Sequence, residues 1–160
     1  MKQALIKGKK SDEYYTPMSA VEQIFEYYKP EGKILLPWDQ DWSNFYKYCI
    51  EHGFDCEHNI RDFMTADYEF DWIISNPPYT EKDAIIERCI ELGKPAVLVL
   101  PIESLGGIKR HASYRKTKLN IFIPERRVEF ISEDGKQTNS AAHHTIYLGI
   151  NFDEQKIVLE

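Results

Sequence analysis

The chain has 160 residues, of which 42% are hydrophobic and 13% aromatic, with 26 acidic and 20 basic side chains and a net charge of −6. This length suits one compact domain over 1–160, and the apolar fraction excludes a largely disordered chain. No apolar run approaches the ~20 residues of a membrane span, and the first residues are too polar for a secretory signal. We therefore expect a cytoplasmic protein without membrane contact, with a flexible N-terminal arm over 1–12.

Helical and strand-like patterns alternate over the first hundred residues. Strands are expected at 33–37, 54–58, 70–75 and 95–101, and helices at 18–28, from a cap at Asp41 or Ser43 to Gly53, and from a cap at Thr80 to Gly93. This alternation predicts an α/β fold with right-handed crossovers and a mostly parallel, doubly wound sheet.

The pattern changes after Asn120. Further strands are expected at 121–123, 128–132 and 145–150, and 133–136 has the composition of a turn. No helix of any length separates the last two strands. The sequence therefore predicts an antiparallel hairpin at one edge of the sheet.

The cysteines and histidines give little sign of a metal site. Cys49, Cys56 and Cys89 are odd in number and scattered, so we expect buried free thiols. His143 and His144 are adjacent, and neighbouring residues of a strand face opposite sides of a sheet. No metal site is predicted.

The most informative peptide reads Asp-Trp-Ile-Ile-Ser-Asn-Pro-Pro-Tyr and spans 71–79. Its apolar strand delivers Asn76 to the carboxyl end of a parallel sheet, where open α/β sheets bind ligands. Pro77 and Pro78 have a fixed φ and no N–H, so they stiffen the turn and direct its carbonyls away from the strand ladder. The side-chain oxygen of Asn76 and a carbonyl of this turn therefore predict a pair of acceptors, and the ring of Tyr79 predicts a stacking surface beside them. That arrangement suits a planar group with an amino substituent, such as adenine, although a stiff structural loop is the alternative.

The Asn-Pro-Pro-Tyr tetrapeptide resembles the catalytic motif of the amino-methyltransferases, in particular the DNA adenine-N6 methyltransferases that use S-adenosylmethionine. The resemblance implies a trimmed Rossmann-like class I methyltransferase fold and a target base flipped out of the duplex. It also implies that Asn76 and the Pro77 carbonyl bind the target amine, that Pro78 stiffens the turn, and that Tyr79 stacks on the base. The sulfonium methyl is already electrophilic, so catalysis would consist mostly of orientation and electrostatics.

Three other segments resemble the cofactor-binding parts of this family. The Thr-Pro dipeptide before the first helix resembles the motif at the methionine end of the cofactor, although an ordinary helix cap explains the same residues. The Asp-Phe dipeptide, which begins 14 residues before Asn76, resembles the pair that holds the cofactor adenine, and the acidic residue at the end of the second strand is the expected partner of the ribose. The residues expected to bind cofactor in these segments are Tyr15, Thr16, Pro17, Glu57, Asp62 and Phe63.

The turn after the first strand lacks the glycines that the resembled family usually has there. No glycine occurs between Gly32 and Gly53. Either the turn has another geometry, in which Pro37, Trp38 and Asp39 shape the cofactor site, or cofactor binding is weakened. Short phage-borne or prophage-borne adenine methyltransferases have a similar Pro-Phe/Trp-Asp stretch, which favours the first alternative. The short spacing from this turn to Asn76 further predicts that one crossover helix and the outermost strand are reduced to a loop.

Basic residues gather between 109 and 127, where seven cationic side chains and one acidic one give a local charge of +6 and leave −12 for the rest. Such a stripe suits DNA phosphates, and a solvated loop is an equal alternative. No block of the chain is large enough for a target-recognition domain. Recognition would then be of low specificity, come from a loop at 104–118 that is mobile without DNA or from a hairpin tip at 135–144, or depend on a partner specificity subunit. The expected nucleic-acid-binding residues are Lys109, Arg110, Arg115, Lys116, Lys118 and Arg126.

Two alternatives to a DNA adenine methyltransferase stay open. Enzymes that methylate guanine N2 in RNA or glutamine in proteins share the tetrapeptide but generally keep the glycine turn. A catalytically silent binding subunit, or a phage decoy with a methyltransferase fold, would lack that turn, but it has no chemical need for an intact Asn-Pro-Pro-Tyr.

Overall fold

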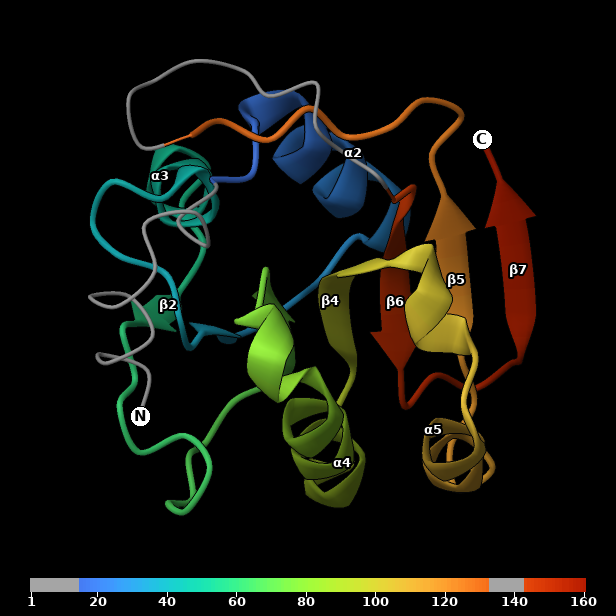
Figure 1. Ribbon diagram of the computed structural model, residues 1–160. Coiled ribbons are helices and arrows are strands. Elements are labelled where there is room, and N and C mark those ends of the chain that lie inside the picture. The colour runs from blue at the N-terminus through green and yellow to red at the C-terminus, as the bar shows by residue number, and fades with distance from the viewer. Residues whose placement is uncertain (1–14, 133–142) are drawn as a thin grey trace.

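The strands of the described residues form one sheet in the order β2-β1-β3-β4-β6-β5-β7 (Figure 1). The computed structural model describes residues 15–132 and 143–160, so the expected arm over 1–12 and the expected turn at 133–136 lie outside the described residues. The strands are β1 (Ile34–Leu36), β2 (Cys56–His58), β3 (Trp72–Ser75), β4 (Ala96–Pro101), β5 (Asn120–Ile123), β6 (Thr145–Ile150) and β7 (Lys156–Leu159). The helices are α2 (Met18–Tyr28), α3 (Asn44–Glu51), α4 (Lys82–Leu92) and α5 (Ile108–Tyr114), with short 3₁₀ turns at Tyr79–Glu81 and Ile102–Leu105.

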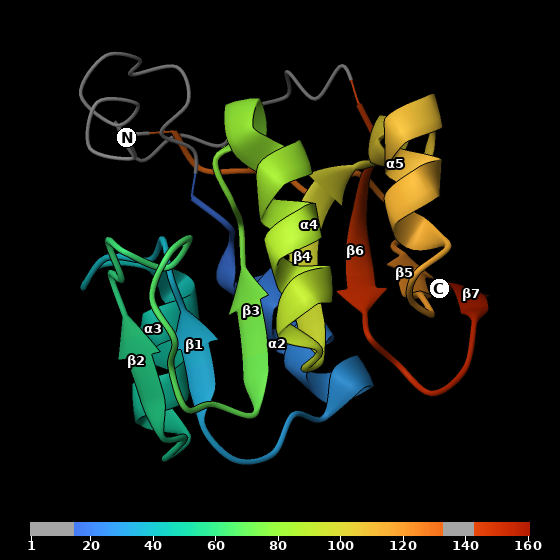
Figure 2. The same ribbon diagram turned by 90° about the horizontal axis from the view of Figure 1, so that it is seen from below.

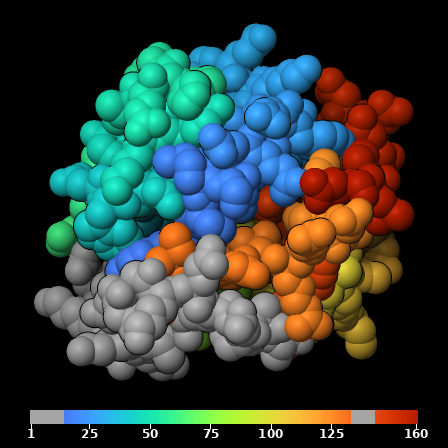
Figure 3. Space-filling view, turned by 90° about the horizontal axis from the view of Figure 1, so that it is seen from above, coloured from blue at the N-terminus to red at the C-terminus, as the bar shows by residue number. Residues whose placement is uncertain are grey.

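Helices cover both faces of the sheet. Helices α4 and α5 lie on one face (Figure 2), and α2 and α3 cover the other, where they form much of the surface in Figure 3. Alternate residues of β4 serve the two resulting cores: Leu98 and Leu100 face α4, while Val97 and Val99 face α2. No helix within the described residues is long and apolar enough to cross a membrane.

The parallel half of the sheet confirms the predicted alternation. Strands β2, β1, β3 and β4 are mutually parallel neighbours. Ser43 is the N-cap of α3, since its hydroxyl accepts a hydrogen bond from the backbone N–H of Phe45 (3.1 Å). The prediction that Thr80 caps α4 is wrong, because a 3₁₀ turn follows the two prolines and the helix begins only at Lys82.

The prediction that one crossover helix is reduced to a loop is also confirmed. Residues 59–71 contain neither a helix nor a strand, so β3 follows β2 along the chain without a crossover helix. Strand β2 is therefore the outermost strand on this side of the sheet.

The second half contains the predicted antiparallel element, but with a different partner strand. Strand β6 pairs antiparallel with both β4 and β5, so β6 lies between two strands that precede it in the chain. The segment 128–132 is not a strand of the sheet; its recorded pairing is one bridge from Ile131 to Tyr15, as the chain runs back towards α2 (Figure 1). Strand β7, which we did not predict, adds to β5 in parallel and forms the far edge.

Candidate active site

The carboxyl ends of the parallel strands carry most of the predicted site. The turn after β1 places Pro37, Trp38 and Asp39 there, and the end of β3 places Asn76 beside them, because β1 and β3 are hydrogen-bonded neighbours. Helix α3 starts from the same edge, and its first residue, Asn44, donates a hydrogen bond to the Thr16 carbonyl (2.9 Å). The fold thus brings together three of the segments predicted from separate parts of the sequence.

The Asn-Pro-Pro-Tyr turn presents two acceptors without donors. The Oδ1 atom of Asn76 is buried and makes no hydrogen bond with the described residues. The Pro77 carbonyl likewise accepts no hydrogen bond from the described residues, whereas the next carbonyl, that of Pro78, accepts from the Glu81 N–H (3.1 Å). Buried acceptors normally have partners in native proteins. This turn therefore has the unused capacity that binding of an amino group requires.

Tyr79 follows the two acceptors and begins the 3₁₀ turn. The residue is 38% exposed, which leaves part of its surface available to a ligand. Desolvation by the surrounding protein raises the pKa of its hydroxyl above the ordinary value, so the side chain is neutral at physiological pH. A neutral aromatic residue that is partly exposed is suited to stacking on a planar group.

Asp39 connects the β1 turn to the end of β3. Its carboxylate is buried and accepts hydrogen bonds from the hydroxyls of Ser43 (2.6 Å) and Ser75 (2.8 Å). Ser75 is fully buried and directly precedes Asn76. The predicted cofactor ligand Asp39 therefore has both oxygens engaged by the protein, and it fixes the position of the strand end that carries Asn76.

The absence of glycine from the β1 turn has a simple geometric explanation. None of the residues between Gly32 and Gly53 has a positive φ, so the turn does not enter the left-handed region in which glycine is favoured. The turn therefore has a geometry that does not need glycine. The left-handed residue at this edge is instead Asn59, directly after β2 (φ 53°).

The Thr-Pro segment lies at the start of α2, as predicted, and does not form an ordinary cap. Pro17 is the N-cap residue, no side chain caps the helix, and its first turn has no acidic residue. The Thr16 hydroxyl is buried and has no hydrogen-bond partner among the described residues. An uncapped helix start beside an unpartnered hydroxyl favours the binding of an anion such as a carboxylate. Tyr15 packs against Trp42, with ring centroids 4.3 Å apart.

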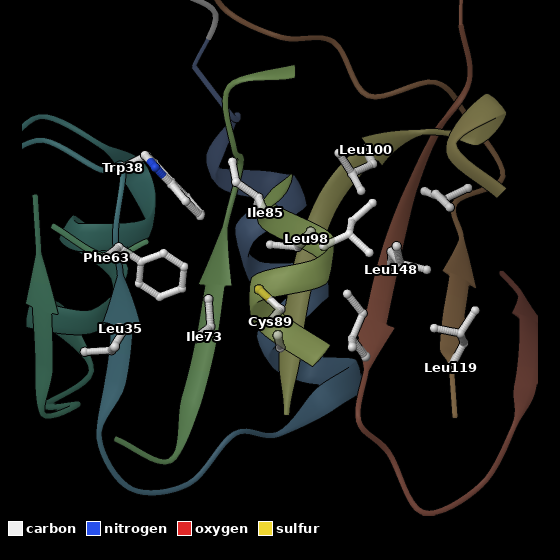
Figure 4. Close-up of a cluster of buried hydrophobic side chains, with 14 of the residues drawn as sticks. Leu35, Trp38, Phe63, Ile73, Ile85, Cys89, Leu98, Leu100, Leu119 and Leu148 are labelled. Atoms are coloured by element: carbon white, nitrogen blue, oxygen red, sulfur yellow. The ribbon is translucent and has the colours of Figure 1, made fainter. Parts of the chain in front are cut away.

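Phe63, predicted to hold the cofactor adenine, and Trp38, predicted to shape the cofactor site, both lie in the core that faces α4 (Figure 4). Phe63 is 2% exposed and meets Trp38 edge to face, with centroids 5.2 Å apart. Asp62, in contrast, is exposed and accepts a hydrogen bond from the Tyr68 hydroxyl, which raises the pKa of Tyr68 to about 12. The predicted Asp-Phe pair is therefore divided between surface and core.

Arg88 holds the loop that carries this pair, a role that the sequence analysis missed. Its side chain is only 11% exposed, and its guanidinium donates to the backbone carbonyls of Phe63 (3.1 Å) and Ala66 (2.7 Å). The same group pairs with Glu91 on the outside of α4 (2.8 Å). Backbone carbonyls leave no residue signature in a sequence, so nothing in the helical pattern of α4 distinguishes this arginine.

Glu57 lies in β2 and pairs with Lys33 (3.0 Å), the residue before β1. Its carboxylate therefore points towards a residue at the amino end of the neighbouring strand. The residue that ends β2 is His58, whose imidazole lies 2.6 Å from the Asp41 carboxylate and stacks on Tyr46. A second acidic group, Asp41, thus contacts the residue that ends β2.

The predicted basic residues do not form one surface. The segment 104–118 is largely helical: α5 packs beside α4, and Tyr114 is buried with its hydroxyl bonded to the Ser104 carbonyl (2.7 Å). This corrects the expectation that 104–118 is a loop. Helix α5 runs away from the site, since Thr117 beyond its end contacts Asn151 (2.9 Å) at the amino end of β4.

The basic side chains are therefore divided between the two ends of the sheet, one at the carboxyl ends of the parallel strands and one at their amino ends. Lys109, Arg110 and Arg126 lie towards the carboxyl ends of the parallel strands, where the candidate site is. Arg110 is paired with Asp83 (2.6 Å). The others, near the amino ends of the parallel strands, are Arg115, Lys116 and Lys118. The second candidate for recognition, 135–144, lies outside the described residues except for His143 and His144. No group of three or more potential metal ligands occurs in the part of the chain that the structure describes.

Comparison with known proteins identifies the architecture. No protein-family model and no curated sequence matches the chain. A protein from Listeria monocytogenes described as a class I S-adenosylmethionine-dependent methyltransferase matches with a TM-score of 0.57 and 12% identity, over 91% of this chain and 64% of that protein. A protein from Pyrococcus horikoshii described as an RNA methyltransferase matches with a TM-score of 0.53 and 11% identity, over 89% of this chain and 87% of that protein. The chain has the class I methyltransferase fold.

Within the class I methyltransferase fold, the strand order of this chain brings a segment from the second half of the chain to the site. The parallel strands β1, β2 and β3 have their carboxyl ends on the same side of the sheet, and the antiparallel β6 begins on that side. Residues just before β6 therefore also lie on the side of the candidate site. His143, just before β6, contacts Glu103, just after β4.

Proposed function

We propose that the chain transfers a methyl group from S-adenosylmethionine to the exocyclic N6 of adenine in DNA. The observation that carries the proposal is the pair of unpaired acceptors, Asn76 Oδ1 and the Pro77 carbonyl, at the end of β3 in a class I methyltransferase fold. The two N–H groups of a primary amine are the matching donors. Tyr79, a partly exposed aromatic residue, directly follows them in the chain.

The acceptors act by orientation. Two hydrogen bonds from the amine to fixed acceptors direct its nitrogen lone pair and stabilise the positive charge that develops on nitrogen during transfer. When bound, S-adenosylmethionine supplies a methyl group that is already electrophilic, so no strong base is required of the chain. The amine proton is released to solvent after the new N–C bond has formed.

The residues present fit the cofactor at two points. The unpartnered Thr16 hydroxyl and the uncapped start of α2 would take its carboxylate. At the other end, Pro37, Trp38 and Asp62 lie on loops at the ends of β1 and β2, and Asp41 adds a carboxylate suited to ribose hydroxyls. Asp39 and Phe63 would support these groups from within the core rather than contact the cofactor.

A base is a better match than a protein side chain for this site. The ring of Tyr79 offers a stacking surface to a planar heterocycle, and Lys109 and Arg126 supply cations at the same edge of the sheet for a phosphate backbone. Guanine N2 in RNA and the glutamine amide also present two N–H groups, so they are the alternative products to be measured. A partner subunit remains part of the proposal as the source of sequence specificity.

The test is a direct analysis of the product. The protein is incubated with isotopically labelled S-adenosylmethionine and DNA from a host without adenine methylation, and the digested nucleosides are analysed by mass spectrometry for N6-methyladenine. We expect Asn76→Ala to lower the rate by roughly 10²-fold or more, in line with the loss of one preorganised transition-state partner. Tyr79→Phe should retain activity and Tyr79→Ala should lose roughly 5- to 150-fold, because stacking and not the hydroxyl is required.

Three results would contradict the proposal. Methylation that persists in Asn76→Ala would remove this residue from the mechanism. Labelled N2-methylguanine or methylglutamine, with RNA or protein as substrate and no labelled adenine, would assign another substrate. Calorimetry that detects no binding of S-adenosylhomocysteine at millimolar concentration to the folded protein would favour the silent binding subunit.

A further inference from the structure

Strand β7 forms an edge of the sheet that is not protected against pairing. Its side chains Ile157 and Leu159 are 62% and 75% exposed. The strand has no proline, and no charged side chain lies between its two ends. The opposite edge, β2, is one residue shorter and carries the Glu57–Lys33 ion pair. Natural edge strands are usually protected by charge, proline or shortness; β7 has a lysine only at its first position, so its apolar central residues make it the less protected of the two edges.

The backbone of β7 fixes which groups face outward. Lys156 and Glu160 donate their N–H groups inward, to Leu119 (2.9 Å) and Ile123 (3.1 Å) of the β5 segment. Because backbone direction alternates along a parallel strand, Ile157 and Leu159 present their N–H and C=O groups to the free edge. The two exposed aliphatic residues are thus the residues available for a new ladder.

We propose that the β7 edge pairs antiparallel with β7 of a second copy of this chain, about a two-fold axis through Val158. In that register Ile157 faces Leu159 of the copy, and both are outward-facing residues, as a hydrogen-bonded antiparallel pair requires. The four aliphatic side chains fall on one face and cover each other. On the other face Lys156 meets Glu160 of the copy, once on each side of the axis.

The charges of β7 are self-complementary, which favours a second copy of this chain as the partner. The Glu160 carboxylate lies on the α2 face, where it accepts from Gln23 (2.7 Å) and from the Glu125 N–H (2.8 Å). A carboxylate has about four acceptor sites, so it can also accept from Lys156 of the copy. Shifting the register by one residue would place inward-facing and outward-facing residues opposite each other and would lose both the ladder and the ion pairs. A two-fold interface of this kind is closed and stops at a dimer.

Cross-linking tests the register. In Val158→Cys the new thiol faces its own copy in a non-hydrogen-bonded pair, where Cα atoms lie ~4.5 Å apart, within the ~4.4–6.8 Å range of disulfides. We expect mild oxidation to give a covalent dimer. The matched control is Glu154→Cys, an exposed position outside β7 and outside the proposed ion pairs; its thiol would lie about eight residues, or ~26 Å, from its copy, and it should stay monomeric on a non-reducing gel. Equal cross-linking of both variants, or of neither, would overturn the register.

Charge reversal tests the interface by a second route. Light scattering during gel filtration should give the wild type twice the 18.8 kDa mass of one chain at high protein concentration. Lys156→Glu and Glu160→Lys should each weaken the dimer, and the double variant should restore it, because the ion pairs are re-formed with opposite sign. A wild type that stays monomeric at near-millimolar concentration, or a double variant weaker than both singles, would refute the proposal. Assembly only with a peptide or another protein would assign this edge to a different partner.

Discussion

The buried carboxylate of Asp39 gives the sharpest prediction about stability. It accepts hydrogen bonds from Ser43 and Ser75, which are 6% and 0% exposed. Replacing it with alanine removes both acceptors and leaves two buried hydroxyls to find new partners. The isosteric Asn variant keeps one carbonyl oxygen, and its amide can donate to the second serine, whose hydroxyl is able to accept.

The expected cost follows from these contacts. A hydrogen bond to a charged group contributes about 1.5–3 kcal/mol. The sum for two such bonds is reduced because Asp39→Ala also removes the desolvation penalty of the carboxylate. We therefore expect Asp39→Ala to lower the free energy of unfolding by about 3 kcal/mol and Asp39→Asn by about 1 kcal/mol.

Asp41 is the matched control, since it lies in the same turn but its side chain is 89% exposed. Its interaction with His58 is a surface contact, so Asp41→Ala should cost no more than about 0.5 kcal/mol. Urea unfolding followed by circular dichroism measures all three variants. If Asp39→Ala is no more destabilising than Asp41→Ala, the two serine hydrogen bonds do not anchor the strand end, and the explanation of how Asn76 is positioned is wrong.

Three further predictions follow from groups outside this network. Arg88→Ala should destabilise the protein by about 2 kcal/mol, since it removes two hydrogen bonds from a largely buried charged donor, and amide hydrogen exchange should rise first in the loop that it holds; unchanged exchange there would refute the role. Burial raises the pKa of Cys89 to about 12, so in the folded protein a thiol reagent should modify the half-buried Cys56 well before Cys89, and equal rates would count against the packing. The Arg110 guanidinium holds the pKa of Asp83 below its usual value of 3.8. Because that pKa is lower in the folded state, the pair stabilises the protein above pH ~4 and loses this contribution as the pH falls through the depressed pKa; the stability gap between wild type and Arg110→Met, at most about 1 kcal/mol for a surface pair, should close in acid.

The parallel half of the fold was predictable because its signals are local. The apolar run before Asn76 and the apolar stripe of α4 each specify one element, and Ser43 caps α3 by a contact two residues away. The loop at 59–71 was predictable from arithmetic alone, since the chain between the two strands is too short for a helix. The two acceptors of the turn also followed from residue chemistry.

The rest depended on contacts between distant segments. The alternating burial of 128–132 comes from packing against α2 and not from pairing in the sheet, so it imitates a strand. Strand β7 is short and has no alternation of polarity, because its outer face is exposed and apolar. The division of the basic residues between the two ends of the parallel strands could not be predicted from a charge count, since it depends on the direction in which α5 runs.

The position of β6 between β4 and β5 has a consequence for how the chain is completed on the ribosome. Strand β4 ends at Pro101 and β5 at Ile123, yet the strand that joins them is not finished until Ile150. Until then β4 has an open side and β5 has no neighbour, because β7 comes later still. The first four strands can form during synthesis from contacts close in sequence, whereas the remainder must wait for the long-range pairing of β6, which is the slower step by its separation along the chain. A nascent chain stalled before residue 145 should therefore expose a β4 edge that a chaperone or another nascent chain can reach.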